Sequence, residues 1–171
     1  ILQSTTQEFA LGLTASHRES GATLLGGEIP FPSIGADSQG NTRITALRFF
    51  QEYTQRNQSA VLAFRSQFSV GLNALNATLN AAPPDGNFFV WRGQAQYVRL
   101  VAPDTLLLLR GDIQLADRPL VPLEQFGIGG QDSVRGYRQD QLFTDSGIFA
   151  SAEVRIPILR LPRLDNAVLQ L

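Results

Sequence analysis

The sequence contains 171 residues with no Met and no Cys, and its 14 Lys and Arg nearly balance 15 Asp and Glu, leaving a net charge of −1. The absence of Cys excludes disulfides, thiolate metal sites and Cys nucleophiles, and the near-neutral charge argues against nucleic acid as a partner. No stretch approaches the roughly 18 consecutive apolar residues of a membrane helix. A mean hydropathy of −0.03 is still compatible with membrane strands, because their apolar and polar residues alternate.

Segments with an apolar side chain at every second position predict β-strands along the whole chain. They span residues 6–16, 42–53, 62–72, 89–97, 107–115 and 147–158, and a seventh strand begins at 166 without being completed. The connections alternate in length, with long ones at 17–41, 73–86 and 117–146 and short ones at 56–59, 102–104 and 160–165. This alternation is typical of an outer-membrane barrel, which has long extracellular loops and short periplasmic turns. We therefore expect an all-β fold that forms part of an antiparallel transmembrane β-barrel.

The polar positions of these strands face away from their apolar ones, as a watery lumen requires. Strand 107–115 directs Leu109 outward and Gln114 inward, so we expect Leu109→Arg to damage membrane stability and Gln114→Arg to be tolerated. The alternation is imperfect only at Phe50 in the strand at 42–53. A soluble β-sandwich would also alternate, but its loops need not alternate in length.

A glycine-dense segment at 126–137 contains Gly129 and Gly130 followed by the tetrad Val134, Arg135, Gly136 and Tyr137. Glycine permits tight turns and close backbone approach, so we expect the chain to fold back there with Gly129 and Gly130 as a hinge. The tetrad, the upstream Glu124-Gln125-Phe126 and the downstream run from Gly147 through Glu153 and Arg155 to Pro157 resemble the two-partner-secretion transporters of the outer membrane (TpsB family, hemolysin secretion/activation type).

This resemblance implies a sixteen-stranded barrel of which the chain covers about strands seven to thirteen. It also implies that residues 1–171 are one partial barrel domain, without the remaining strands and the periplasmic polypeptide-transport-associated (POTRA) modules. The chain, which has no Met, is then a fragment of a longer protein. The loop at 117–146 would fold back into the barrel, and Arg135 would pair with Glu153 on the inner wall. Arg155 shares that inward face, and an interior ion ladder with Arg110 and Asp112 is the alternative role for both residues.

The function implied is export of an unfolded partner protein through the lumen of a monomeric barrel in the lipid of a Gram-negative-type outer membrane. Two alternatives stay open, namely insertion of other barrels into that membrane and a passive porin or adhesin. No cofactor and no metal site are expected. An enzyme is disfavoured because no nucleophile, base and orienting group converge, and His17 is expected to be a surface residue where a strand meets a loop.

Overall fold

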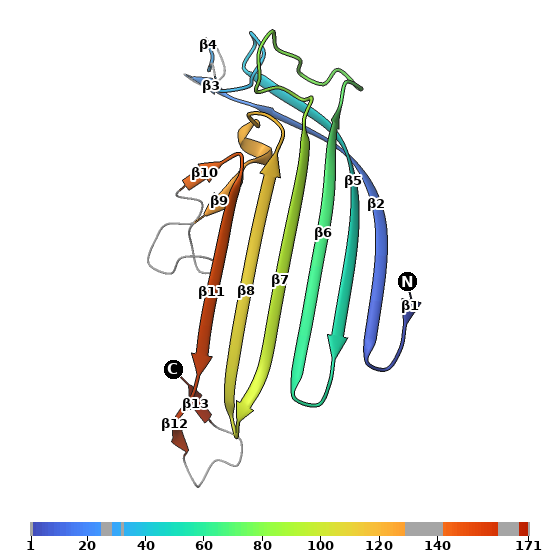
Figure 1. Cartoon of the computed structure of the whole chain (residues 1–171). Coiled ribbons are helices and arrows are strands. Elements are labelled where there is room, and N and C mark those ends of the chain that lie inside the picture. The colour runs from blue at the N-terminus through green and yellow to red at the C-terminus, as the bar shows by residue number, and fades with distance from the viewer. Residues whose placement is uncertain (1, 25–28, 32, 129–141, 161–167, 171) are drawn as a thin grey trace.

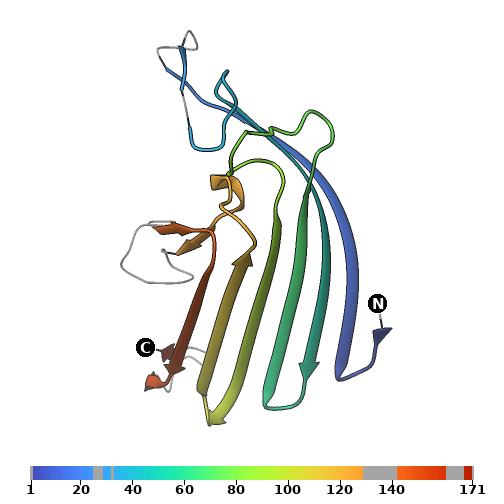
Figure 2. The same ribbon diagram turned by 45° about the horizontal axis from the view of Figure 1, so that its top comes forward.

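The computed structural model describes residues 2–24, 29–31, 33–128, 142–160 and 168–170, and its main feature is one antiparallel seven-stranded sheet. The strands lie in the order β1-β2-β5-β6-β7-β8-β11. Their bounds are Leu2–Gln3 for β1, Gln7–Gly21 for β2, Asn41–Arg56 for β5, Ala60–Leu72 for β6, Phe89–Ala102 for β7, Thr105–Ala116 for β8 and Gly147–Arg155 for β11. The sheet is curved and stays open across the described residues (Figures 1 and 2). The expected all-β architecture of a partial barrel is confirmed.

Short elements occupy the connections and the chain end. They are the hairpins β3 (Thr23–Leu24) with β4 (Ile29–Pro30), β9 (Phe126–Ile128) with β10 (Leu142–Thr144) and β12 (Pro157–Arg160) with β13 (Val168–Gln170), and the 3-10 turn η2 (Pro122–Glu124). Among the described residues, no helix is long and apolar enough to cross a membrane.

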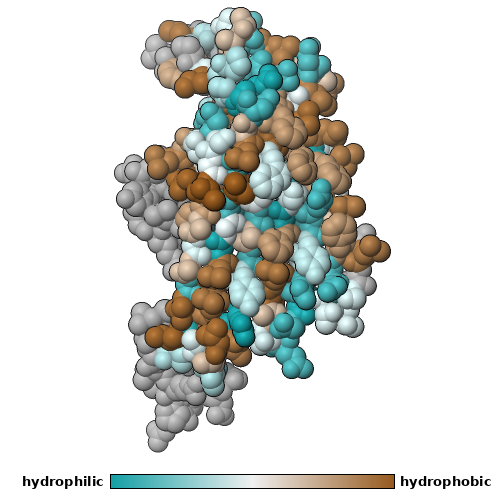
Figure 3. Space-filling view, in the orientation of Figure 1, coloured by the Kyte–Doolittle hydropathy of each residue, from teal (hydrophilic) through white to brown (hydrophobic). Residues whose placement is uncertain are grey.

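The register of the sheet aligns apolar residues into rows on one face, which we call the apolar face. One such row crosses five strands, with neighbours paired in the order Leu13, Phe49, Phe68, Trp91 and Leu115. Leu13 is 66% and Leu115 is 51% exposed. Exposed apolar rows of this kind mark contact with lipid or a partner. Figure 3 shows apolar (brown) and hydrophilic (teal) side chains interleaved over the side of the molecule seen in Figure 1.

The opposite side, which we call the polar face, carries amide and charged residues in register. Glu52, Arg65, Gln94 and Asp112 are successive neighbours across β5, β6, β7 and β8. Near the end of the sheet where the long connections lie, this face becomes apolar and forms the buried core, made of Ile44, Ala46, Phe88, Val90, Leu120 and Val121. The core therefore lies on the inner side of the sheet and includes two residues from the segment after β8.

Several expected strand boundaries differ from the structure: β5 continues to Arg56 and β7 to Ala102, and two further differences change the assignment of a segment. The loop expected at 17–41 begins later, because residues up to Gly21 continue β2 and pair with β5 through His17↔Thr45 and Glu19↔Arg43. Residues 17–20 are polar on both faces, so this part of the strand has no apolar alternation to reveal it. The strand expected at 147–158 ends at Arg155, and the residues after it form β12, which pairs with β13.

Candidate functional site

The polar face is lined with charged residues that are paired with each other. Arg65 and Glu52 lie 2.5 Å apart, Arg110 and Asp112 lie 3.1 Å apart, and Arg155 and Glu153 lie 3.5 Å apart. Gln94 Nε2 donates to Asp112 Oδ1 at 2.7 Å, which joins β7 to β8. Because each of these three arginines has a carboxylate close by, this part of the wall combines many hydrogen-bonding groups with little net charge.

Glu153 and Arg155 lie on the polar face of β11. The strand β11 alternates, with Glu153 and Arg155 half-buried and Ala152 and Val154 exposed. The ion pair between them runs along β11, as the pair between Arg110 and Asp112 runs along β8. Both pairs lie within a single strand, and the ladder expected between β11 and β8 stays a prediction.

The segment that follows β8 turns onto the polar face and packs there. Leu120 and Val121 are 1% and 0% exposed and contact the core residues of β5 and β7. Asp145, on the returning side of the same connection, accepts hydrogen bonds through Oδ1 from the Leu120 backbone amide at 2.9 Å and from Gln125 Nε2 at 3.0 Å. Both described flanks of the connection are thus tied together against the wall.

Glu124, at the end of the 3-10 turn η2, provides the charged contact of this segment with the wall. Its Oε1 lies 2.5 Å from Arg48 Nη2 of β5 and 3.6 Å from Arg18 Nη1 of β2. Arg48 also donates a hydrogen bond to Ser16 Oγ. The side chains of Arg48 and Glu124 are only 11% and 10% exposed, so this ion pair is well shielded from water.

Gln114 of β8 lies beneath the same segment and is fully buried. Its Nε2 donates to the backbone carbonyl oxygens of Glu124 at 3.1 Å and Asp145 at 3.0 Å, while its Oε1 accepts from Arg92 Nε at 2.9 Å. One buried amide therefore holds both flanks of the connection.

The predicted hinge Gly129 and Gly130 and the tetrad Val134, Arg135, Gly136 and Tyr137 lie outside the described residues. The pairing of Arg135 with Glu153 remains a prediction. What the structure describes is the inner-wall position of Glu153 and the base of the loop, where residues 117–128 and 142–146 lie.

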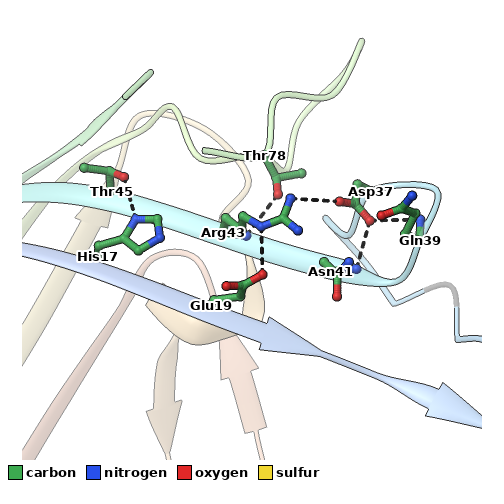
Figure 4. A network of polar contacts seen from close by, with 8 residues as sticks. All are labelled: His17, Glu19, Asp37, Gln39, Asn41, Arg43, Thr45 and Thr78. Carbon is green, nitrogen blue, oxygen red and sulfur yellow. Dashed lines mark hydrogen bonds and ion pairs between the residues drawn. The ribbon is translucent and has the colours of Figure 1, made fainter. Parts of the chain in front are cut away.

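A second polar network joins the long connections at the outer end of the sheet (Figure 4). Arg43 of β5 bonds Glu19 of β2 at 2.8 Å and approaches Asp37 at 3.5 Å, while its backbone amide donates to Thr78 Oγ1 at 2.9 Å. His17 Nδ1 lies 2.9 Å from Thr45 Oγ1 and its side chain is exposed, as expected for a surface residue, although within β2. This network ties the connections at 22–40 and 73–88 to the ends of β2 and β5.

The contacts of Glu124, Arg48 and Gln114 were not foreseen from the sequence. In the sequence Glu124 is marked only by its place in a motif, and its partner Arg48 is 76 residues away along the chain. A pattern of alternation assigns Arg48 to a face but does not identify which loop residue meets it.

No group of three or more His, Asp or Glu side chains in the described part of the chain is arranged to hold a metal ion. The chemistry of this site is that of a polar wall with a chain segment folded against it.

Comparison with known proteins gives one family and one solved structure. Residues 3–170 match the model of the haemolysin secretion/activation protein family ShlB/FhaC/HecB. The structure of CdiB from Escherichia coli is similar to this chain with a TM-score of 0.74 and 21% identity, over 95% of this chain and 30% of CdiB. The chain thus spans less than a third of the length of that relative. A search of curated protein sequences finds no significant match.

Proposed function

Because the chain belongs to the haemolysin secretion/activation family ShlB/FhaC/HecB, we propose that its parent protein exports a partner protein across the outer membrane through the lumen of its β-barrel. Members of this family are outer-membrane proteins of Gram-negative bacteria. The cargo is an unfolded polypeptide, the barrel acts as a monomer surrounded by outer-membrane lipid, and the process breaks and forms no covalent bond.

The observation that carries this proposal is the contrast between the two faces of the sheet. The apolar face exposes large side chains such as Leu13 and Leu115, which lipid would cover. The polar face offers amides and paired charges such as Glu52 with Arg65. A passing polypeptide carries backbone donors and acceptors and charges of both signs, and a charge-compensated wall supports hydrogen bonds with it without trapping one sign of charge.

We further propose that the tetrad loop regulates this passage through Arg135. Its guanidinium would pair with Glu153, whose carboxylate lies on the polar face of β11 near Arg155. The planar fork of arginine binds a carboxylate bidentately, which fixes the orientation of the loop as well as its distance from the wall. Gly129 and Gly130 would serve as the hinge, and Val134, Gly136 and Tyr137 would shape the turn that presents Arg135.

Secretion by cells that produce the parent protein and its partner tests both parts of the proposal. We expect the partner in the medium with the wild-type barrel, a strong reduction with Arg135→Ala or Glu153→Arg, and partial recovery when Arg135→Glu is combined with Glu153→Arg. Arg43→Ala is the matched control, because it removes an arginine whose carboxylate partner Glu19 lies on a neighbouring strand, in the network at the outer end of the sheet rather than on the polar face. Heat-modifiable gel migration reports whether each barrel is folded.

A folded wild-type barrel that releases no partner would contradict the export function. Normal secretion by Arg135→Ala, or a double exchange as defective as the worse single change, would contradict the pairing of Arg135 with Glu153 and leave export itself intact.

A further inference from the structure

The middle of the apolar face is hollowed between β6 and β11. Two hollows of about 490 and 440 Å³ adjoin there, and both are lined by the cross-strand neighbours Phe64, Ala95, Gly111 and Ala150. The first three of these residues each lie four positions along their strand from a member of the apolar row that contains Trp91, so they share its face. We call the two hollows together the outer groove. Their volumes fall in the range of roughly 300–1,000 Å³ that is typical of sites for small molecules.

Gly111, at the bottom of the outer groove, is a glycine that the packing of the sheet does not explain. At the other five glycines of the seven-stranded sheet a Cβ atom would come within 3.0 Å of a neighbouring atom, whereas at Gly111 the nearest would be the Phe149 carbonyl oxygen at 3.9 Å. The pairing of Gly111 with β7 and β11 is also regular, without a bulge. Glycine weakens the interior of a strand and otherwise marks a place where a ligand or another backbone approaches closely. The open space over Gly111 therefore indicates contact with something outside this sheet.

The surface around Gly111 offers hydrocarbon rather than hydrogen-bonding groups. Leu109 and Ile113 flank it on the same face of β8, and its backbone lies within the ladders to β7 and β11. At the edge of the groove, the indole Nε1 of Trp91 already donates to Ser66 Oγ at 3.0 Å. A sugar or a peptide would leave its own polar groups without partners here. A hydrocarbon chain needs none, so it is the chemistry that fits.

A positive charge lies on the same face, toward the short turns. Arg99 is exposed and lies four positions after Ala95 on β7, and its cross-strand neighbours Ala60 and Leu107 are uncharged. The next residue of β7 donates its backbone amide to the carbonyl oxygen of Ser59, in the turn at 57–59. Four residues of a strand span roughly 13 Å, which is within the roughly 15 Å of hydrocarbon in one leaflet. Arginine suits such an interface position because its guanidinium binds phosphate bidentately.

From this geometry we propose that the outer groove binds an anionic phospholipid of the periplasmic leaflet, with an acyl chain over Gly111 and its phosphate at Arg99. The inference rests on the proposed function, since it requires the apolar face to lie in outer-membrane lipid, and the groove is continuous with that lipid contact. The leaflet follows from the short turns beside Arg99, because the short turns of outer-membrane barrels are periplasmic.

Quenching of Trp91 fluorescence by brominated lipid tests the site. This is the single Trp in residues 1–171, it lines the groove, and its ring would lie 3.1 Å from a Cβ atom at Gly93. The full-length parent protein, with any Trp outside this stretch replaced by Phe, is reconstituted in phosphatidylcholine vesicles. A minor fraction of the lipid is either phosphatidylglycerol or phosphatidylcholine with brominated chains. We expect the brominated phosphatidylglycerol to quench Trp91 about twofold more at the same mole fraction, because Arg99 attracts its net negative charge.

Variants separate the groove from ordinary lipid contact. Gly111→Leu fills the groove with a side chain whose Cβ has space, and it should make the two lipids quench equally. Arg99→Gln should do the same, whereas Arg99→Lys keeps the charge and should keep the preference for phosphatidylglycerol. Ala15→Leu is the matched control, because it adds the same side chain to the apolar face of β2, outside the groove. It should leave the preference unchanged.

Heat-modifiable migration shows whether each variant is folded, and Ala150→Leu, which fills the same groove from β11, replaces Gly111→Leu if that variant does not fold. Equal quenching by the two lipids in the wild type, or an unchanged preference in the filled variant, overturns the proposal. Protection of Trp91 from both lipids by a second copy of the barrel would overturn it as well.

Partner secretion is measured separately in cells. A barrel that shows the lipid preference but does not secrete its partner refutes the export function and leaves the lipid site intact. A barrel that secretes its partner without any lipid preference refutes the lipid site alone.

Discussion

On the polar face, Phe50 departs from simple alternation, and its contacts explain why an apolar residue lies there. The Phe50 ring lies against Gly12, where a Cβ atom would come within 2.1 Å of a ring carbon, and the Arg65 guanidinium lies 4.9 Å from its centre. Aromatic packing over a glycine and a cation–π contact thus accommodate an apolar residue on the polar face.

Gln114 was expected to tolerate arginine, but its side chain is fully buried and its amide binds Arg92, Glu124 and Asp145. That expectation is corrected, since arginine would have neither space nor these partners.

The faces themselves are tested by placing an arginine on either side of the sheet. Leu109→Arg puts a charge on the apolar face and should cost about 2–4 kcal/mol of barrel stability if the site lies near the bilayer midplane. Ala63→Arg is the matched control, because Ala63 lies on the polar face and its neighbours Thr54 and Gln96 are uncharged. We expect little effect from it in urea-unfolding titrations of the parent barrel in lipid vesicles. Equal losses from both changes would show that the faces are assigned incorrectly.

At the scale of the strands, the sequence predicted the elements whose faces differ in polarity and missed those whose faces do not. The central residues of β5, β6, β7 and β8 lie where the sequence predicted strands. Lipid on one side and water on the other impose the alternation that reveals them. The end of β2 from His17 to Gly21 was missed because the backbone ladder with β5 needs no apolar side chains. Cross-strand contacts such as Glu19 with Arg43 stabilise this extension, and a pattern of single residues does not reveal them.

Hydrogen exchange distinguishes the extended strand from a loop at this position. Alternate amides of residues 17–21 should exchange at least about tenfold more slowly than those of residues 79–84 in the connection before β7, because the former are directed to β5. Arg43→Ala should increase exchange in residues 17–21 and leave β8 unchanged, since it removes the contact with Glu19. Mass spectrometry of the parent barrel in detergent measures both segments. Rapid exchange of 17–21 in the wild type would restore the loop assignment.

For the molecule as a whole, the alternation of long and short connections was the most informative property of the sequence. Consecutive antiparallel strands run in opposite directions, so every second connection lies at the same end of the sheet. The lengths of the connections therefore predicted an antiparallel barrel without locating any contact. They did not predict how residues 117–128 cross the polar face, since that depends on pairings such as Arg48 with Glu124 between distant parts of the chain. Strand alternation places Glu153 on the polar face of β11, whereas its role as the partner of Arg135 and the placement of Arg135 remain predictions.

The alternation of connections between the two ends of the sheet also determines which of them face the outside of the cell. The connections at 22–40, 73–88 and 117–146 all leave the upper end of the sheet, and the turns at 57–59 and 103–104 lie at the other end (Figure 1). In an outer-membrane barrel the long connections are extracellular, so Ser38→Cys and Ala81→Cys should react with a membrane-impermeant maleimide on intact cells. Gln58→Cys should react only after the outer membrane is permeabilised. All three positions are exposed, and this stretch of the protein has no Cys that could react in their place. Labelling of Gln58→Cys on intact cells, with Ser38→Cys protected, would mean that the barrel has the opposite orientation, and the tetrad loop would then enter the lumen from the periplasm.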